Sequence, residues 1–305
     1  MARPATAPGT GGIAHMPGIR DHRIGRAMRM LEQLMGEEID YGRVAAAVGL
    51  SLSRFHHLFV EQAGETPGEY LRRIRLDAAA TRLRWTDETV LTIAANLSYA
   101  SQSSFIKAFE RRYGMSPIRF RKARDQWPDG SAEKVAATQV GIRRGAGFRL
   151  LARRYTGLPC YVPEYWQDFL ARLPEGLGSA GQHLFVGILR DDMRFVPPEQ
   201  VRYDCCVTVS EAFEDEATAS LWPDFFPLAL PPTTYAGLDY RGYYLAASSP
   251  SGTQHIGDTY FWLLDTWLSQ SRYRLGGDYV AELHVRPPVP GMEASCTILL
   301  PVAAA

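Results

Sequence analysis

Residues 101–117 read SQSSFIKAFERRYGMSP, and residues 51–67, fifty positions upstream, read SLSRFHHLFVEQAGETP. Both segments contain two phenylalanines spaced four residues apart, Phe55 and Phe59 in the first copy, followed by a glycine and a proline at matching positions. Self-similarity over this length indicates a duplicated supersecondary unit.

Each copy predicts two helices joined by a tight turn. In the first copy, an alanine-rich helix over 41–48 precedes Gly49, a residue suited to the left-handed conformation that often ends helices. In the second copy, a short helix over 90–96 precedes a Ser-Tyr turn at 98–99, and Ser101 can cap the next helix. The pattern favours a helix-turn-helix, with an ordinary helical hairpin as the alternative.

The second helix of each unit presents side chains that can bind DNA. The phenylalanines define the buried face, so the polar residues between them point outward. These outward residues are Ser53, Arg54, His56 and His57 in the first copy and Gln102, Ser103, Ser104 and Lys107 in the second. A basic cluster that follows includes Arg111, Arg112, Arg121 and Lys122. Glutamine can bind adenine and lysine can reach guanine, whereas the two histidines could equally be solvated.

Residues 20–124 resemble the DNA-binding domain of the AraC/XylS family of transcription regulators, most specifically over 101–117 and 120–121. The Ser-Tyr pair at 98–99 departs from the usual Gly-Phe. The resemblance implies seven helices, one of them a long helix over about 67–85. It also implies two recognition helices in successive major grooves about 34 Å apart.

By position, the resemblance also implies roles for single residues. The implied base contacts are Ser53, His56, His57, Gln102, Ser103 and Lys107. The implied phosphate contacts, which set affinity rather than sequence choice, are Arg111, Arg112, Arg121 and Lys122.

Composition limits the class of protein. The 305 residues are 46% apolar and 22% charged, which is typical of folded soluble proteins and excludes disorder of the whole chain. The net charge is zero, yet residues 1–130 carry +5 and residues 131–305 carry −5. That asymmetry favours a polyanion as the partner of the first half. The uncharged stretch 242–257 is too polar to span a membrane.

Four segments follow from these patterns. Residues 1–18 are rich in glycine and proline and predict a disordered tail, and residues 19–124 form the helical domain. Residues 125–146 are polar and predict a linker, and residues 147–305 predict an α+β effector domain. The cysteines fit reduced thiols in the cytoplasm, and they are Cys160, Cys205, Cys206 and Cys296.

The second domain also contains a repeat. A strand with a Tyr-x-Gly motif occurs at 148–157 and again at 234–242, and an aromatic helix follows each, over 163–173 and 256–268. Two further strands follow each helix, so the order β-α-β-β occurs twice, and two such units can enclose an aromatic cleft. The expected fold class is therefore multidomain: an all-α double helix-turn-helix domain followed by an α+β domain of two β-α-β-β repeats.

Residues 147–301 resemble the GyrI-like effector-binding domain, through this spacing, RYDC at 202–205, the late Glu282 and TILLPV at 297–302. The resemblance implies that Glu282 points into a ligand cleft, where a carboxylate among aromatic rings suits lipophilic cations. The alternatives are a solvent-facing Glu282 and plain core positions for the aromatic residues. The implied aromatic ligand contacts are Trp166, Tyr203 and Tyr260.

The late strand departs from the GyrI-like family at two positions. Strand alternation places Val280, Glu282 and His284 on one face. Ala281 and His284 stand where the family usually has an aromatic residue and a tyrosine, which widens the cleft. The alternative function is a small-molecule hydrolase with Glu282 as base, which requires a buried carboxylate with a raised pKa. The missing tyrosine argues against it.

The sequence gives no sign of a metal site or a cofactor. His183, His255 and His284 lack ligand spacing, and Cys205 and Cys206 would point to opposite faces of a strand. We therefore expect a cytoplasmic protein that is not an enzyme. Its expected partners are double-stranded promoter DNA, RNA polymerase and a small amphipathic or cationic effector or partner protein, and no membrane.

Overall fold

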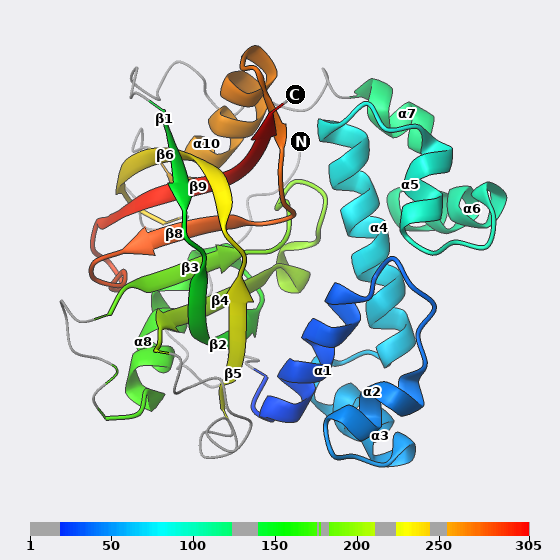
Figure 1. Cartoon of the computed structure of the whole chain (residues 1–305), viewed down its shortest axis with the longest axis horizontal. Coiled ribbons are helices and arrows are strands. Elements are labelled where there is room, and N and C mark those ends of the chain that lie inside the picture. Colours follow the sequence, from blue (N-terminus) through cyan, green and yellow to red (C-terminus); the bar gives the residue numbers. More distant parts are fainter. Residues whose placement is uncertain are drawn as a thin grey trace, which may run out of the picture.

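The computed structural model describes residues 19–123, 140–175, 177, 183–210, 224–244 and 255–304. The predicted tail and most of the predicted linker lie outside these residues. The described residues form a helical lobe and a β-sheet lobe that lie side by side (Figure 1). Within them, no helix is both long and apolar enough to cross a membrane.

The described part of the helical lobe contains the seven helices that the AraC/XylS resemblance implies. The central helix is nineteen residues long, which gives it a length of about 28 Å. Figure 1 shows the second and third helices at one end of it and the fifth and sixth at the other. The helices are α1 (His22–Gln33), α2 (Tyr41–Ala47), α3 (Leu52–Ala63), α4 (Pro67–Trp85), α5 (Val90–Asn96), α6 (Gln102–Tyr113) and α7 (Pro117–Lys122).

The two units have equivalent helix caps. The Oγ atoms of Ser51 and Ser101 each accept a hydrogen bond from the backbone N–H three residues later, at 3.3 and 3.1 Å. Gly64 and Gly114 end α3 and α6 with φ angles of 73° and 70°. The repeat seen in the sequence is therefore a repeat of conformation.

The departure from the family at 98–99 does not change the turn. Ser98 has a φ angle of 57°, close to the 71° of Gly49 at the matching position of the first unit. A side chain in this left-handed conformation costs about 1–2 kcal/mol. The ring of Tyr99 lies 5.2 Å from that of Phe105, so Tyr99 packs against the core of the second helix-turn-helix unit.

Each unit has its own hydrophobic core, and α4 contributes to both. Phe55 and Phe59 are fully buried with ring centroids 5.6 Å apart, and Phe105 and Phe109 are fully buried 5.7 Å apart. The first half of α4 packs into the first core and its second half into the second core. A single rigid helix therefore fixes the distance between the two units.

The β-sheet lobe contains one nine-stranded sheet. Its path runs β1-β6-β9-β8-β3-β4-β2-β5, and the short β7 pairs with β9. All described strand pairs are antiparallel. The strands are β1 (Gly141–Gly145), β2 (Phe148–Thr156), β3 (Phe185–Leu189), β4 (Arg202–Thr208), β5 (Phe226–Leu230), β6 (Thr233–Gly242), β7 (Tyr273–Leu275), β8 (Val280–His284) and β9 (Ala294–Ala304).

The strand order confirms the two predicted β-α-β-β repeats. The first repeat is β2-α8-β3-β4, with α8 over Val162–Arg172, and the second is β6-α10-β8-β9, with α10 over Ile256–Phe261. The second helix continues as a π-helix over Trp262–Leu268. In the sheet, β6-β9-β8 mirrors β2-β4-β3 about an axis between β8 and β3. Strand β8 of the second repeat therefore pairs directly with strand β3 of the first repeat.

The predicted linker needs a correction at its end. Residues 125–146 were expected to form a linker, yet 141–145 form strand β1, which pairs with β6. The strand includes Arg143 and Arg144 and is largely exposed, so it has no apolar alternation that would signal a strand. Hydrogen bonds to the sheet edge, rather than burial, place it there.

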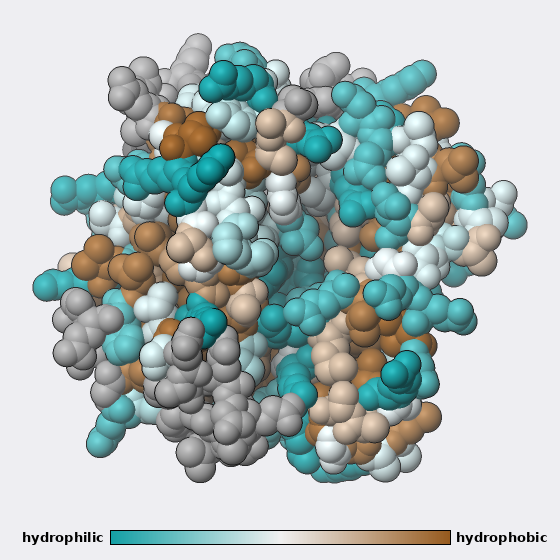
Figure 2. Space-filling model, in the orientation of Figure 1, coloured by the Kyte–Doolittle hydropathy of each residue, from teal (hydrophilic) through white to brown (hydrophobic). Residues whose placement is uncertain are grey.

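Buried ion pairs join the two lobes. The guanidinium of Arg154 on β2 donates to Asp204 on β4 at 2.7 Å and also to Glu32 on α1. Glu32 accepts a further hydrogen bond from Arg202 at 2.8 Å. Figure 2 shows hydrophilic atoms along the groove between the lobes. A carboxylate of the helical lobe is thus held by arginines of the sheet lobe.

The lobes also share apolar contacts. Phe195, from the connection between β3 and β4, is part of the core of the second helix-turn-helix unit. Its ring lies 5.2 Å from that of Phe120 on α7. At the end of α4, Arg84 forms an ion pair of 3.0 Å with Asp265 of the π-helix. The second unit is therefore packed directly against the sheet lobe.

Candidate functional site

The two expected recognition helices lie at opposite ends of α4. Figure 1 shows α6 on the side of the helical lobe that faces away from the sheet and α3 at the lower end of that lobe. The length of α4, about 28 Å, is of the order of the 34 Å that separates successive major grooves on one face of DNA. Insertion of the two helices into neighbouring grooves stays a prediction.

Most of the predicted DNA contacts are exposed on these helices. His56 is the exception on α3, because its ring is half-buried 6.1 Å from that of Tyr41 and 5.8 Å from that of Phe55. Its neighbour His57 is exposed. The exposed residues of the predicted set are Ser53, Arg54, His57, Gln102, Ser103, Ser104, Lys107, Arg111 and Lys122.

Three residues of the predicted set have structural partners. Ser104 completes the cap of α6, since its Oγ donates to the carbonyl oxygen of Ser101 at 2.7 Å. Arg112 donates to Asp77 on α4 at 2.7 Å. Arg121 donates to the carbonyl oxygen of Leu83 at 3.3 Å and to that of Glu88. These side chains hold helices together, a role that the basic cluster in the sequence did not reveal.

The sheet lobe contains a buried carboxylate at the pseudo-twofold axis. Glu282 on β8 is 1% exposed, which excludes the solvent-facing alternative. Its Oε2 accepts hydrogen bonds from Tyr203 at 2.9 Å and from Tyr244, and its Oε1 accepts one from Tyr260. His284 lies 3.1 Å away through Nε2. Both repeats therefore contribute side chains to one polar cluster.

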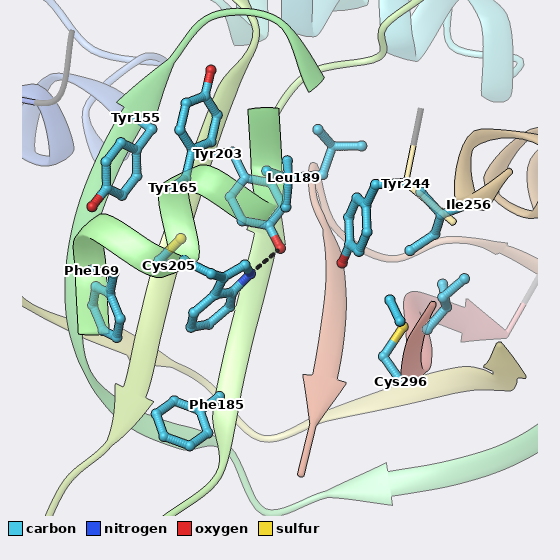
Figure 3. Close-up of a cluster of buried hydrophobic side chains, with 14 of the residues drawn as sticks. Tyr155, Tyr165, Phe169, Phe185, Leu189, Tyr203, Cys205, Tyr244, Ile256 and Cys296 are labelled. Carbon is cyan, nitrogen blue, oxygen red and sulfur yellow. Dashed lines mark hydrogen bonds between the residues drawn. The ribbon is translucent and has the colours of Figure 1, made fainter. Parts of the chain in front are cut away.

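Trp166 extends this cluster into the first repeat. Its indole Nε1 donates to the hydroxyl of Tyr203 at 3.2 Å, and it is fully buried. Figure 3 shows this bond as a dashed line, with the hydroxyl of Tyr244 directed to the same region. All four predicted ligand contacts are thus brought together. Their role in binding a ligand stays a prediction.

Sequence reasoning missed part of the cluster. Tyr244 lies after β6 and outside the predicted strands, so nothing in the local pattern pointed to it. His284 was placed on the correct face of β8 but not assigned to the site. Gly187 on β3 is paired with Glu282, and a Cβ there would meet the hydroxyl of Tyr203 at 1.9 Å. Only glycine allows Tyr203 to reach the carboxylate across that strand.

The carboxylate of Glu282 is held in its charged form. Burial raises its pKa, but hydrogen bonds from His284 and the tyrosines outweigh this, so the net pKa lies below the ordinary value. Burial and the neighbouring Glu282 raise the pKa values of Tyr203, Tyr244 and Tyr260, which stay protonated donors. The hydrolase alternative required a raised pKa for Glu282, and that condition is not met.

One group of metal-binding residue types occurs among the described residues. Ligand atoms of Glu282, His284 and Cys296 lie within 4.8 Å of one another, and all three are buried. The Nδ1 atom of His284 has no hydrogen-bond partner there. Its Nε2 is held by Glu282, however, and burial raises the pKa of the Cys296 thiol. These features favour a hydrogen-bonded carboxylate over a metal centre, and no metal is assigned.

The two neighbouring cysteines of β4 are structural. Cys205 packs in the core beneath α8, and Cys206 packs in the cluster on the other side of the sheet. They therefore point to opposite faces, as expected. Burial raises the pKa values of both thiols well above the ordinary value, which keeps them protonated and unreactive.

Comparison with known proteins gives matches for both lobes. Residues 44–123 match the family described as "Helix-turn-helix domain". Curated relatives include the HTH-type transcriptional activator RhaS of Enterobacter sp. (strain 638) and the HTH-type transcriptional regulator Rv1931c of Mycobacterium tuberculosis (strain ATCC 25618 / H37Rv). Both are 36% identical, over 105 and 107 residues, which is 34% and 35% of this chain. The chain spans 38% of the length of each, less than two thirds.

A solved structure of an AraC-type transcriptional regulator from Chromobacterium violaceum is 23% identical, with a TM-score of 0.34. The match covers 35% of this chain and 95% of that chain. Residues 139–303, more than half of the chain, match the family described as "GyrI-like small molecule binding domain". The chain therefore belongs to the GyrI-like small molecule binding family and carries an AraC-type helix-turn-helix domain in front of that domain.

Proposed function

We propose that the chain is a sequence-specific DNA-binding transcription regulator controlled by a small molecule. The observation that carries the first part is the pair of equivalent helix-turn-helix units, each with an exposed polar second helix, held apart by α4. Its relatives in this region are named transcriptional regulators. Double-stranded promoter DNA in the cytoplasm is the proposed partner, and RNA polymerase stays a predicted one.

Within this proposal, the two recognition helices read bases and the basic residues bind phosphates. Gln102 and Lys107 are both exposed, five residues apart on α6, and are the proposed base contacts of this helix. Arg111 and Lys122 are exposed without carrying the structural bonds of Arg112 and Arg121. Phosphate contacts of this kind raise affinity for every sequence alike.

Selection from a random duplex library with the full chain is the first test. We expect one enriched motif with two half-sites about one helical turn apart. Fluorescence anisotropy then compares this duplex with a scrambled one at two salt concentrations. Selection that enriches no motif would refute sequence-specific recognition and leave only polyanion binding.

Two variants separate base contacts from phosphate contacts. Gln102→Ala should weaken binding to the selected duplex by about 5- to 150-fold, because a good base contact contributes about 1–3 kcal/mol. It should leave binding to scrambled DNA nearly unchanged. Lys122→Ala is the matched variant and should weaken binding to both duplexes by a similar factor. An equal loss on both duplexes for Gln102→Ala would contradict the assigned base contact.

For the sheet lobe, we propose that Glu282 binds a lipophilic cation. The supporting observation is an ionised, buried carboxylate among aromatic rings contributed by both repeats. Glu282 lines none of the described cavities, and the hollow beside Tyr260 and Val280 has a volume of only about 50 Å³. A drug-sized ligand needs roughly 300 Å³ or more. Binding therefore requires Tyr244 and Tyr260 to move, and the cation then replaces their hydrogen bonds to the carboxylate.

This movement has a direct connection to the helical lobe. Tyr260 lies on α10, and the same helix continues into the π-helix that carries Asp265. Asp265 pairs with Arg84 at the end of α4, beside the second helix-turn-helix unit. We propose that displacement of Tyr260 shifts this ion pair and so changes the position of the second unit. A ligand can act in this way only through unequal affinity for the two arrangements.

The ligand proposal is tested with tetraphenylphosphonium as probe and triphenylphosphine oxide as its neutral analogue, by calorimetry on the full chain. We expect binding of the cation only, and a loss of about 10- to 150-fold in Glu282→Gln, since bonds to a buried charge contribute about 1.5–3 kcal/mol. Glu293→Gln, an exposed carboxylate on the next connection, is the matched control. Equal binding of the neutral analogue would contradict a role for the charge.

A further inference from the structure

A second cavity lies between the two lobes, away from Glu282. It has a volume of about 310 Å³ and is lined by α1 and α4 on one side and by β5 and the connection after β3 on the other. Its apolar lining includes Met35, Ile74, Phe195, Val196 and Leu228. Figure 2 shows the groove between the lobes in which hydrophilic atoms gather. A volume of this size is sufficient for a small organic ligand.

Four arginines and three carboxylates meet at this cavity and beneath it. Three of the arginines are paired: Arg154 and Arg190 with Asp204, at 2.7 and 3.0 Å, and Arg202 with Asp191 at 2.6 Å. The third carboxylate, Glu32, is shared between Arg154 and Arg202. The fourth arginine, Arg29, forms no ion pair among the described residues, and the carboxylates that line the cavity also include Asp77, Asp192 and Asp278.

Arg29 lies on α1 and is half-buried. Its Nη1 atom is buried and has no hydrogen-bond partner among the residues that the structure describes. The guanidinium lies over the ring of Phe226, 5.7 Å from its centroid. Burial, and then the neighbouring Arg190, lower the pKa of Arg29 to about 10. The nearby carboxylates Asp204 and Glu32 act in the opposite direction, but Nη1 still has no acceptor among the described residues, and an anion in the cavity would supply one.

The other carboxylates that line the cavity do not form an ion pair with Arg29. Asp77 is held by Arg112 and Tyr113, each at 2.7 Å, and Asp192 is paired with Arg194 at 2.6 Å. Asp278 also lines the cavity but is exposed. Each therefore has a partner other than Arg29 or is solvated.

Arg190, at the end of β3, has hydrogen-bond donors to spare. Only its Nε is bonded among the described residues, to Asp204, and its guanidinium lies 5.8 Å from the ring centroid of Tyr279. Its two Nη groups remain for a ligand. Guanidinium groups bind carboxylates through paired N–H donors, which makes this ligand class suitable.

We propose that this cavity is a second effector site, which binds a small organic carboxylate between Arg29 and Arg190 with its apolar part against Phe195. Arg29 belongs to the helical lobe and Arg190 to the sheet lobe, so the bound carboxylate joins the two lobes. The ligand differs in charge from the one proposed for Glu282. The site does not depend on that proposal, because neither arginine contacts the tyrosine cluster.

Binding is tested by calorimetry and saturation-transfer NMR on the full chain, with hexanoate as probe. Hexan-1-ol and hexylammonium are its neutral and cationic analogues. We expect hexanoate alone to bind and Arg29→Met to lower its affinity at least tenfold, because a hydrogen-bonded ion pair is lost. Arg29→Lys, which keeps the charge, should retain most of the affinity.

A structural role of Arg29 predicts a different result for the free protein. If Arg29 only supported the interface, Arg29→Met would lower the unfolding temperature. Removal of a half-buried charge that forms no ion pair among the described residues should instead leave that temperature unchanged or raise it. Arg43→Met, an exposed arginine on α2, is the matched control and should retain hexanoate binding.

The outcomes separate this proposal from the others. Glu282→Gln should bind hexanoate as the unmodified chain does, and Arg29→Met should still bind tetraphenylphosphonium. The proposal is refuted if hexanoate does not bind, or if it binds equally to Arg29→Met. Inorganic phosphate that competes as strongly as hexanoate would refute the assigned ligand class, because the apolar lining would then contribute nothing.

Discussion

Asp204→Asn should lower the free energy of unfolding by about 3–5 kcal/mol, the usual cost of removing one partner from a buried ion pair. Asp204 is fully buried and accepts hydrogen bonds from Arg154 at 2.7 and 2.9 Å and from Arg190 at 3.0 Å. Asparagine keeps the shape but leaves two buried guanidinium groups undercompensated. Urea denaturation at neutral pH measures the difference.

The same variant has a characteristic pH dependence. Burial raises the pKa of Asp204, but the charges of Arg154 and Arg190 lower it by more than burial raises it. The net pKa of Asp204 in the folded protein therefore lies below 3.8. A carboxyl group with a depressed folded-state pKa stabilises the protein above its unfolded pKa and loses this effect as the pH falls. The difference between the two proteins should therefore shrink below about pH 4.

Asp239→Asn is the matched control for this prediction. Asp239 lies on β6 of the same sheet, is exposed, and accepts a hydrogen bond from Thr297 at 2.7 Å. An exposed substitution of this kind should change stability by about 0.5 kcal/mol or less. If Asp204→Asn costs no more than Asp239→Asn, the ion cluster between the lobes does not have the stabilising role described here.

Phe109→Ala should lower the free energy of unfolding by about 3–5 kcal/mol and abolish specific DNA binding. Phe109 is fully buried on α6, with its ring 4.6 Å from Tyr113 and 5.3 Å from Phe120. Its removal leaves a cavity at the centre of the second helix-turn-helix core. Denaturation and anisotropy on the selected duplex measure the two effects.

Ile118→Ala is the matched control for Phe109→Ala, because it truncates an apolar side chain that is exposed rather than buried. Ile118 lies on α7 and is 57% exposed, so its truncation removes little buried area. It should leave both stability and DNA affinity close to those of the unmodified chain. A Phe109→Ala protein that still selects the same two half-sites would show that the second unit is dispensable for recognition.

The local patterns predicted the helical domain almost completely. The spacing of Phe55 and Phe59, and of Phe105 and Phe109, gave the buried faces of α3 and α6, and serines and glycines gave their ends. These features depend on contacts within about five residues of the chain, so the sequence contains them directly. The six strands of the two repeats were also predicted, because their apolar runs are short and separated by turns.

Other features were not predictable from local pattern. Strand β1 carries Arg143 and Arg144 and is fixed by pairing with β6, about ninety residues away along the chain. The basic cluster after α6 was read as a set of phosphate contacts, yet Arg112 and Arg121 bind Asp77 and backbone carbonyls of the helical lobe. A charge in a sequence does not show which partner lies beside it in space.

The sequence by itself determined the duplicated helix-turn-helix and the two β-α-β-β repeats, since each depends on periodicity or on a motif. The tertiary structure alone decided that Tyr244 and His284 join Glu282, that Glu32 is held by arginines of the sheet lobe, and that Nη1 of Arg29 has no hydrogen-bond partner among the described residues. Burial and charge balance arise from segments far apart in the chain, and only folding brings those segments together.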